Sequence, residues 1–130
     1  MLQAISNASA IFIAPSNPYL SVDPILAVPG LKAALRTARA RVIAVSPIVG
    51  GNAVKGPTAK LMQEFGLSVT NQAIAEHYAD VLDGLLIDES DAAPRSDIDV
   101  SSSRTLMKSD DDRRRVAQAA LALAERVGKA

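Results

Sequence analysis

Short apolar runs alternate along the chain with segments of helical pattern. The runs cover residues 10–14, 41–45 and 85–87, and a weaker one at 98–100 could extend to residue 106. In the first three runs the apolar residues are continuous, apart from Arg41 at the start of the second, as in strands of a parallel sheet covered on both faces. Alternating strands and helices therefore predict an α/β fold with a parallel sheet, helices on both faces and right-handed crossovers.

Prolines, a glycine and capping residues mark where the helices should begin and end. The expected helices cover residues 2–8, 29–38, 57–66, 70–82 and the segment that follows Ser109. Pro29 and Pro57 suit the first position of a helix, and Gly66 suits a helix end. Ser109 and the three aspartates after it predict the start of the last helix. Its expected apolar stripe is Val116, Ala120, Leu123 and Val127. A short turn should begin at Pro24.

Composition restricts the class of protein. The chain has 130 residues, enough for one domain covering residues 1–130, and 48% of them are hydrophobic. Lysine plus arginine and aspartate plus glutamate each number 14, which argues against a dedicated nucleic-acid binder. Cysteine is absent and His77 is the single histidine, so thiolate sites and two-histidine metal sites are excluded. Without a signal-peptide pattern or a membrane-length apolar run, we expect a cytoplasmic protein.

Three polar loops follow strands and should meet at one edge of the sheet. They cover residues 15–24, 46–57 and 88–91. Ligands of open parallel sheets bind beyond the carboxyl ends of the strands, so this convergence predicts a binding site.

In the first loop, prolines on both sides of Ser16 and Asn17 restrict the backbone. An asparagine held in this way offers a donor and an acceptor to a base or a ribose. The alternative is a turn that only ends the strand.

In the second loop, the amides of Gly50 and Gly51 could approach a phosphate, with Lys55 supplying positive charge. The spacing does not match a Walker loop. The alternative is a flexible connection with a solvated lysine.

In the third loop, Asp88, Glu89 and Asp91 could bind a metal or a substrate hydroxyl, although a solvated turn is the commoner outcome. The low-hydropathy stretch 88–103 is expected to form a surface loop. The three consecutive arginines at 113–115 are expected to form a solvated, ion-paired face.

Four consecutive blocks of the sequence together resemble the 2-phospho-L-lactate transferase family. The blocks are PSNPYLSVDPILAVPGLKAAL, VIAVSPIVGGNAVKGPTAKLMQEFG, YADVLDGLLIDESDA and TLMKSDDDRRRVAQAALALA. They follow the family order over nearly the whole chain. The resemblance implies a Rossmann-like α/β domain, in agreement with the pattern of strands and helices.

The resemblance also implies an activity. The family transfers a phospholactyl-type group from a guanosine-diphosphate-activated donor to the deazaflavin precursor of coenzyme F-420, and GMP is released. Mg²⁺ assists, and related enzymes carry phosphoenolpyruvate or phosphoglycerate in place of 2-phospholactate. The resemblance therefore does not identify the acid.

The resemblance places two segments in the substrate and nucleotide pocket, with Asp88 as a weaker candidate. The implied binding residues are Ser16, Asn17, Pro18, Ser46, Pro47, Val49, Gly50, Gly51, Lys55, Gly56 and Asp88. Asn17 would hold a base or ribose, the two glycines would offer amides, and Lys55 would face phosphate. No catalytic residue is assigned.

The chain departs from the family pattern in one respect. The glycine-rich loop after the first strand and the metal-binding aspartate that follows it are both missing, so the chain matches only the C-terminal part of the family fold. We therefore expect the chain alone to be inactive, because phosphoryl transfer depends on charge neutralisation. The alternatives are a nucleotide-sugar-binding regulator of the same superfamily and a ligand-free oligomerising module. An uncovered sheet edge favours a homo-oligomer.

Overall fold

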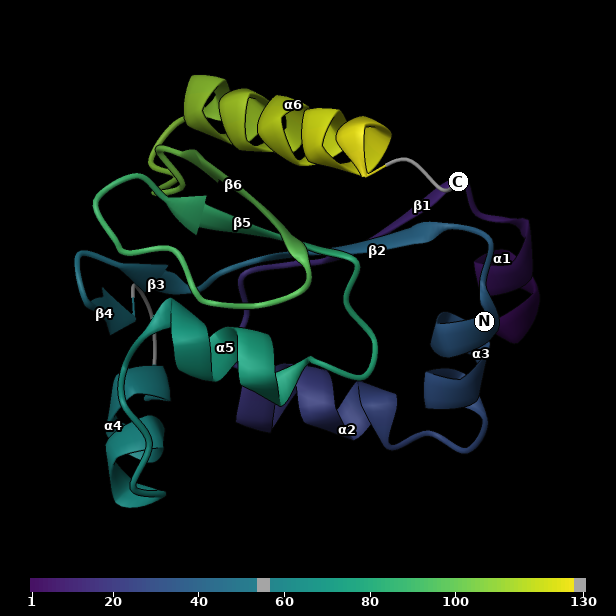
Figure 1. Cartoon of the computed structure of the whole chain (residues 1–130), viewed down its shortest axis with the longest axis horizontal. Coiled ribbons are helices and arrows are strands. Elements are labelled where there is room, and N and C mark those ends of the chain that lie inside the picture. Colours follow the sequence, from purple (N-terminus) through teal and green to yellow (C-terminus); the bar gives the residue numbers. More distant parts are fainter. Residues whose placement is uncertain (54–56, 128–130) are drawn as a thin grey trace.

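The computed structural model describes residues 1–53 and 57–127, and these form a four-stranded parallel sheet. Its strands are β1 (Ala10–Ile13), β2 (Arg41–Val45), β5 (Gly84–Asp88) and β6 (Asp99–Ser103). They lie in the order β1-β2-β5-β6, and each neighbouring pair is parallel (Figure 1). The predicted α/β class with a parallel sheet is confirmed.

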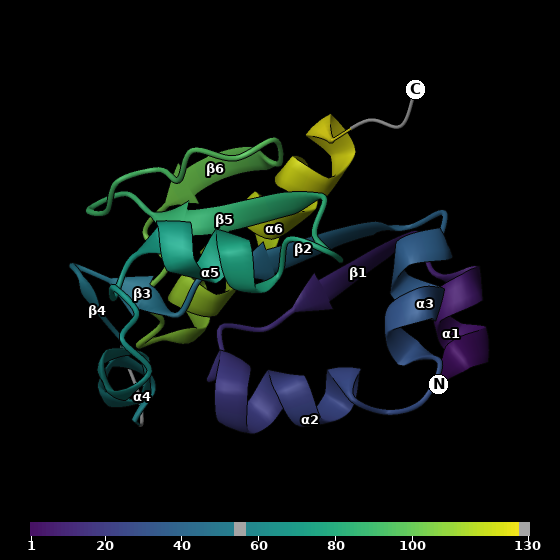
Figure 2. The same cartoon turned by 60° about the horizontal axis from the view of Figure 1, so that its bottom comes forward.

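Helices cover both faces of the sheet. They are α1 (Leu2–Asn7), the π-helix η1 (Pro18–Val22), α2 (Asp23–Leu26), α3 (Leu31–Thr37), α4 (Thr58–Glu64), α5 (Asn71–His77) and α6 (Asp110–Arg126). One face packs against side chains from α2 to α5, such as Leu26 and Ile74. The opposite face packs against α6 through Val116, Ala120 and Leu123 (Figures 1 and 2). Among the described residues, no helix has the length and apolar character needed to cross a membrane.

The C-terminal end of α4 at Gly66 and the start of α6 at Ser109 have the capping interactions that the sequence predicts. Gly66 has φ +73°, and its amide donates to the Gln63 carbonyl at 3.0 Å. The Leu67 amide donates to the Met62 carbonyl at 2.8 Å, which completes a Schellman motif after α4. At the start of α6, Ser109 and Asp112 form a capping box. The predicted stripe of α6 is buried as expected.

Other helix boundaries differ from the prediction. Pro29 lies in a turn, and α3 begins at Leu31 because Gly30 has a left-handed φ of +83°, which a helix cannot contain. Pro57 is the N-cap of α4 and not its first residue. The helix expected over 70–82 ends at His77. Buried residues in the turn after it, such as Tyr78, continue the apolar spacing. The spacing therefore identified buried residues correctly but extended beyond the end of the helix.

Two loop predictions also need correction. The second loop contains an antiparallel hairpin of β3 (Ile48–Val49) and β4 (Asn52–Ala53). Gly50 and Gly51 connect these strands with φ values of 62° and 78°, as in a two-residue turn of type I′. The stretch 88–103 is a loop only in part, because its last five residues form β6. An edge strand is partly solvated and needs no continuous apolar run.

Candidate functional site

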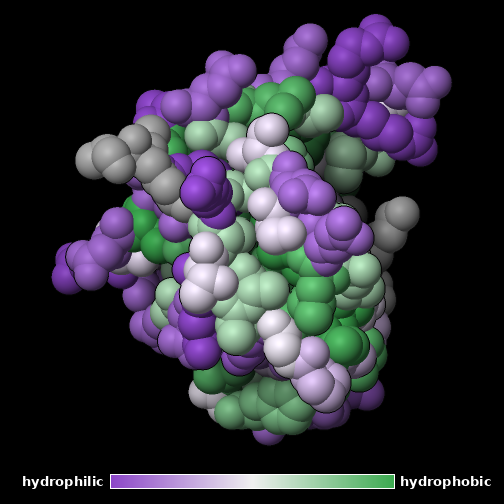
Figure 3. All heavy atoms as spheres, turned by 90° about the vertical axis from the view of Figure 1, so that its right-hand side faces the viewer, coloured by the Kyte–Doolittle hydropathy of each residue, from purple (hydrophilic) through white to green (hydrophobic). Residues whose placement is uncertain are grey.

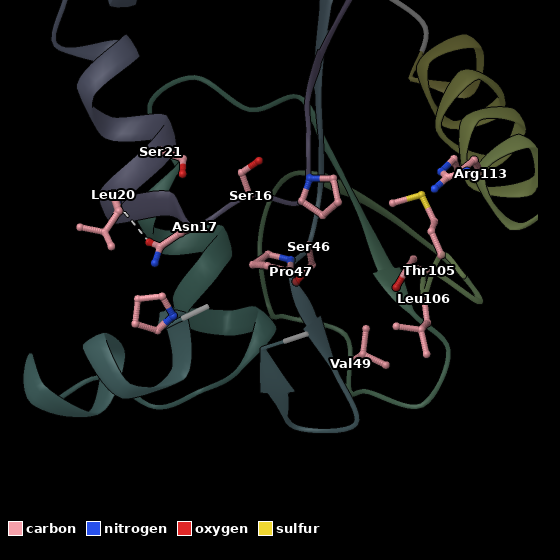
Figure 4. Close-up of a pocket in the computed structure, with 13 residues that line it drawn as sticks. Ser16, Asn17, Leu20, Ser21, Ser46, Pro47, Val49, Thr105, Leu106 and Arg113 are labelled. Atoms are coloured by element: carbon pink, nitrogen blue, oxygen red, sulfur yellow. Dashed lines mark hydrogen bonds between the residues drawn. The ribbon is translucent and has the colours of Figure 1, made fainter. Parts of the chain in front are cut away.

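An open pocket of about 490 Å³ lies at the carboxyl edge of the sheet. It is lined by residues of the segments 15–21, 46–49 and 105–107, together with Pro57 and Arg113. Figure 4 shows Asn17 and Leu20 on one side, Thr105 and Leu106 on the other, and Ser46 between them. The loops after β1, β2 and β6 thus meet as the parallel topology requires.

The sequence-predicted residues divide into three groups in the structure. Ser16, Asn17, Ser46, Pro47 and Val49 line the pocket. Four others lie outside its lining, namely Pro18, Gly50, Gly51 and Asp88. Lys55 and Gly56 lie outside the described residues. The pocket therefore brings together the first predicted loop and the first part of the second.

Asn17 determines the shape of the first wall. Its Oδ1 accepts hydrogen bonds from the Tyr19 amide at 2.9 Å and the Leu20 amide at 3.1 Å. These bonds cap η1, and Pro18 at the first position supplies a suitable φ. The Nδ2 of Asn17 is buried and has no hydrogen-bond partner among the described residues. The Oδ1 of Asn17 thus accepts hydrogen bonds within the fold, whereas its Nδ2 donor has no described partner.

An aromatic cluster attaches this wall to α5. The ring of Tyr19 lies edge-on to His77, with centroids 4.8 Å apart, and to Phe65 at 5.3 Å. His77 Nε2 lies 2.7 Å from Asp23 Oδ1. Burial, and then the charge of Asp23, raise the pKa of the Tyr19 hydroxyl. His77 therefore connects α5 to α2 and lies outside the pocket lining.

The second wall is held by a buried pair of polar side chains. Ser46 is 1% exposed, and its hydroxyl donates to Asn71 Oδ1 at 2.5 Å. The same hydroxyl oxygen accepts from the Ile48 amide at 3.1 Å, which fixes the turn into β3. The pocket residue Ser46 thus has a structural role, because both its donor and an acceptor position are used.

Asp88 fixes the third wall of the pocket, formed by residues 105–107, although it is not itself part of the lining. Its Oδ1 accepts from the amide and hydroxyl of Thr105 at 2.8 and 3.1 Å, and its Oδ2 accepts from the amide and hydroxyl of Ser90 at 3.0 and 2.5 Å. Burial raises the pKa of Asp88, but the hydrogen bonds from Ser90 and Thr105 outweigh it, so the net pKa lies below its usual value. The carboxylate positions Thr105 at the pocket.

The two glycine amides already bind an anion within the chain. The Gly50 amide donates to Asp91 Oδ2 at 2.9 Å, and the Gly51 amide donates to Asp91 Oδ1 at 2.7 Å. Successive amides with positive φ form a concave anion site of the kind that holds phosphate in other proteins. In this structure the carboxylate of Asp91 occupies that position and ties the hairpin to the loop after β5.

Sequence reasoning missed the part of the pocket that follows β6. Thr105, Leu106 and Met107 line the pocket, and Arg113 reaches it from the first turn of α6. Arg113 also pairs with Asp110 at 2.6 Å, so the expected ion-paired face is present. The missed signal was the fourth predicted strand, because its carboxyl end must lie at the same edge as the other three.

The described lining of the pocket provides groups that can bind a ligand. Its described lining contains hydroxyls, apolar side chains and the guanidinium of Arg113, but neither histidine nor a carboxylate. Across residues 1–53 and 57–127, no three histidine, aspartate or glutamate side chains form a group that could hold a metal ion. The described lining therefore offers apolar surface and hydrogen bonds to a ligand.

Comparisons with known proteins point to one family. The sequence model of the family described as "2-phospho-L-lactate transferase CofD" matches residues 1–126. The 2-phospho-L-lactate transferase of Methanosarcina acetivorans is 39% identical over 132 residues, covering 98% of this chain and 42% of that protein. The phosphoenolpyruvate transferase of Kitasatospora aureofaciens is 38% identical over 133 residues, covering 98% of this chain and 41% of that protein.

A third relative shows the same partial coverage. The 2-phospho-L-lactate transferase of Methanococcoides burtonii is 40% identical over 114 residues, which is 84% of this chain and 37% of that protein. The chain thus spans about two fifths of the length of the curated relatives it matches.

Proposed function

The chain belongs to the 2-phospho-L-lactate transferase CofD family, and on this premise we propose that it supplies part of the substrate pocket of such a transferase. The reaction moves a phospholactyl-type group from a guanosine-diphosphate-activated donor to the deazaflavin precursor of coenzyme F-420. The acceptor hydroxyl oxygen bonds to the phosphorus that carries the acid, and the bond from that phosphorus to the bridging oxygen of the diphosphate breaks. GMP leaves with the bridging oxygen, and the hydroxyl proton passes to solvent. A cytoplasmic location is part of the proposal.

The acid on the donor stays open among 2-phospholactate, phosphoenolpyruvate and phosphoglycerate. The relatives are named for two of these groups, 2-phospho-L-lactate and phosphoenolpyruvate.

One observation carries the proposal. The open pocket at the carboxyl edge is built by the loops after β1, β2 and β6, and it contains Ser16, Asn17, Ser46, Pro47 and Val49. These are positions that the family resemblance assigns to substrate or nucleotide. Arg113 at the rim adds positive charge, which suits a phosphate-bearing ligand.

The described residues do not fit a magnesium site. The carboxylate of Asp88 is occupied by donors from Ser90 and Thr105, and that of Asp91 by the amides of Gly50 and Gly51. We therefore propose that residues outside this chain hold the Mg²⁺ that the family implies. On this proposal the chain alone has no transferase activity.

A nuclear magnetic resonance titration of the chain with GDP tests the proposal, with UDP-N-acetylglucosamine as the matched control. We expect amide shifts at Ser16, Asn17 and Val49 with GDP and none with the UDP-sugar. A preference for the UDP-sugar would favour the nucleotide-sugar-binding regulator. The absence of shifts with either nucleotide would contradict a nucleotide subsite within this chain.

A further inference from the structure

Three arginine–aspartate pairs at the start of α6 have the same spacing but not the same surroundings. Arg113, Arg114 and Arg115 each pair with the aspartate three residues earlier. Figure 3 shows hydrophilic side chains at the top of the molecule, where α6 lies in Figure 1, and exposed ion pairs on such a surface contribute little to stability. The side chains of Arg114 and Asp111 are 69% and 91% exposed, whereas those of Arg115 and Asp112 are 29% and 24% exposed. The third pair is therefore largely enclosed by protein.

Arg115 joins α6 to the segment that lines the pocket. Its Nε donates to the Arg104 carbonyl at 3.2 Å, and its Nη2 donates to the Leu106 carbonyl at 3.4 Å. Its Nη1 donates to Asp112 Oδ1 at 2.7 Å. Residues 104–107 belong to no helix or strand, so their backbone groups need partners outside regular structure. The guanidinium supplies two of these partners.

Asp112 extends the same contact toward the first turn of α6. Its Oδ2 accepts from the Lys108 amide at 2.9 Å and from the Ser109 amide at 3.2 Å. The side chains of Asp112 and Arg115 together bond four backbone groups between residues 104 and 109. This stretch contains the third wall of the pocket.

The third wall is thus held from two sides. Asp88, at the end of β5, accepts from the amide and the hydroxyl of Thr105. Arg115 holds the carbonyls of the residues before and after Thr105. Figure 4 shows Thr105, Leu106 and Arg113 on the same side of the pocket, and Arg113 belongs to the same first turns of α6 as Arg115. The shape of this side therefore depends on how α6 is joined to the wall.

Arginine suits this role, and lysine does not. A guanidinium presents five N–H donors in a fixed plane, so it can bond several acceptors at once. Here three different nitrogens of Arg115 each bond a different acceptor. A lysine keeps the positive charge and can pair with Asp112, but it has a single nitrogen in place of the three.

We propose that Arg115 is a positioning residue that holds the third wall, through the carbonyls of Arg104 and Leu106, in the shape that binds the phosphate-bearing ligand. Arg115 lies outside the described lining of the pocket, so it acts through the wall and not by touching the ligand. The inference rests on the proposed function for the identity of the ligand, whereas the effect of Arg115 on the wall does not.

A matched pair of substitutions tests the effect on the wall. Arg115→Lys is compared with Arg114→Lys, the same chemical change at the adjacent, more exposed pair. Hydrogen exchange is followed at the Thr105 amide, which donates to Asp88. We expect exchange about 10-fold faster in Arg115→Lys, because two hydrogen bonds that hold the wall are lost. Arg114→Lys should exchange as the unmodified chain does.

GDP binding gives the second readout, in the titration described above. Arg115→Lys should weaken binding about 10-fold, because the apparent affinity falls with the fraction of protein whose wall is in the binding shape. Arg114→Lys should not change it. Val127→Ala, which removes a buried apolar side chain at the other end of α6, should lower the melting temperature but leave the affinity unchanged. A role of Arg115 in global stability alone would make Arg115→Lys behave like Val127→Ala.

The unmodified chain supplies a readout that needs no variant. The Nε proton of Arg115 bonds the Arg104 carbonyl, so it should exchange more slowly with solvent than the Nε proton of the more exposed Arg114. Its resonance should also shift when GDP binds, since the ligand contacts the wall that this proton holds. Equal exchange of the two Nε protons would overturn the proposal, even if Arg115→Lys did not fold.

The remaining outcomes separate this proposal from the proposed function. Equal exchange of the Thr105 amide in Arg115→Lys and Arg114→Lys would overturn the positioning role. Faster exchange with an unchanged affinity for GDP would overturn it as well, because the held wall would then not matter for binding. Should the unmodified chain bind no GDP, the nucleotide subsite would fail, while faster exchange in Arg115→Lys alone would still uphold the hold of Arg115 on the wall.

Discussion

The carboxyl ends of β1 and β5 lie at the same edge of one sheet but have opposite character. After β5, the carboxylates of Asp88 and Asp91 are occupied by hydrogen-bond donors of the chain itself. After β1, the Nδ2 of Asn17 is buried without a described partner. Ser16 there lines both the pocket and a separate apolar cavity of about 340 Å³ beside β1. The β5 end is complete within the chain, whereas the β1 end leaves polar and apolar groups to be satisfied.

The difference shows why polar residues at a strand end do not identify a site by themselves. An acidic cluster resembles a metal or substrate site until its partners are known, and here the partners are backbone and hydroxyl donors. A buried polar group left unpaired is costly, so it is a stronger indication that something is missing.

Asp88→Asn should have the largest effect, because it removes a charged acceptor that four donors share. We expect a loss of about 3 kcal/mol in the free energy of unfolding, measured with urea. The matched control is Glu89→Gln, the same chemical change at an exposed neighbour. Equal stability of the two variants would show that the β5 end is not held together by this carboxylate.

Acidification should test two carboxylates without mutation, that of Asp88 at the end of β5 and that of Asp112 at the start of α6. The pKa of Asp88 lies below its usual value in the folded state. A hydrogen bond from the Lys108 amide, with Arg115, lowers the pKa of Asp112 to about 2. Both groups bind protons more readily in the unfolded chain, so their contributions are complete above about pH 4 and are lost as the pH falls through the folded values.

Urea unfolding at a series of pH values measures this loss. Stability should decline between about pH 4 and about pH 2. The decline should be shallower in Asp88→Asn and in Asp112→Asn than in the unmodified chain. A slope that neither substitution changes would assign acid sensitivity to other groups.

Substitutions of Asn17 should lower stability less than Asp88→Asn does, and their effect on ligand binding can be measured separately. Asn17→Ala removes the cap of η1 and should cost about 1 kcal/mol. Asn17→Asp keeps an acceptor and should retain most of the stability, but it lacks the Nδ2 donor. Weaker GDP binding by both Asn17→Ala and Asn17→Asp, measured in the same titration, would assign that donor to the ligand, because only Asn17→Asp adds a charge that repels GDP. Unchanged binding would remove Nδ2 from the site.

Asp91→Ala should have the smallest global effect, less than about 1 kcal/mol, because its bonds lie at an exposed hairpin tip. Locally, the amides of Gly50 and Gly51 should exchange faster with solvent. The control is Asp97→Ala, at an exposed position of the same loop. Unchanged exchange at both glycines would show that Asp91 does not hold the hairpin.

The sheet was predictable from sequence because its central strands are buried on both faces. After Arg41, the run at 41–45 had to be apolar, as did the run at 85–87, and the two runs coincide with β2 and most of β5. The cap at Ser109 and the stripe of α6 were predictable for a similar reason, since both depend on residues close in sequence. The edge strand β6 was less predictable because partial burial weakens its pattern. The end of α5 was less predictable because buried turn residues such as Tyr78 continue the apolar spacing beyond the helix.

The sequence by itself determined the α/β class, the order of its elements and the family. It also located the loops that follow the strands, because residue type and spacing encode burial and local caps. Only the tertiary structure decided which polar residues use their hydrogen bonds within the fold. Asp88 meets Thr105, and Asp91 meets Gly50 and Gly51, across contacts that no local pattern specifies. The exposure of Phe12 also depends on where α6 ends over the sheet, which is a property of packing between distant segments.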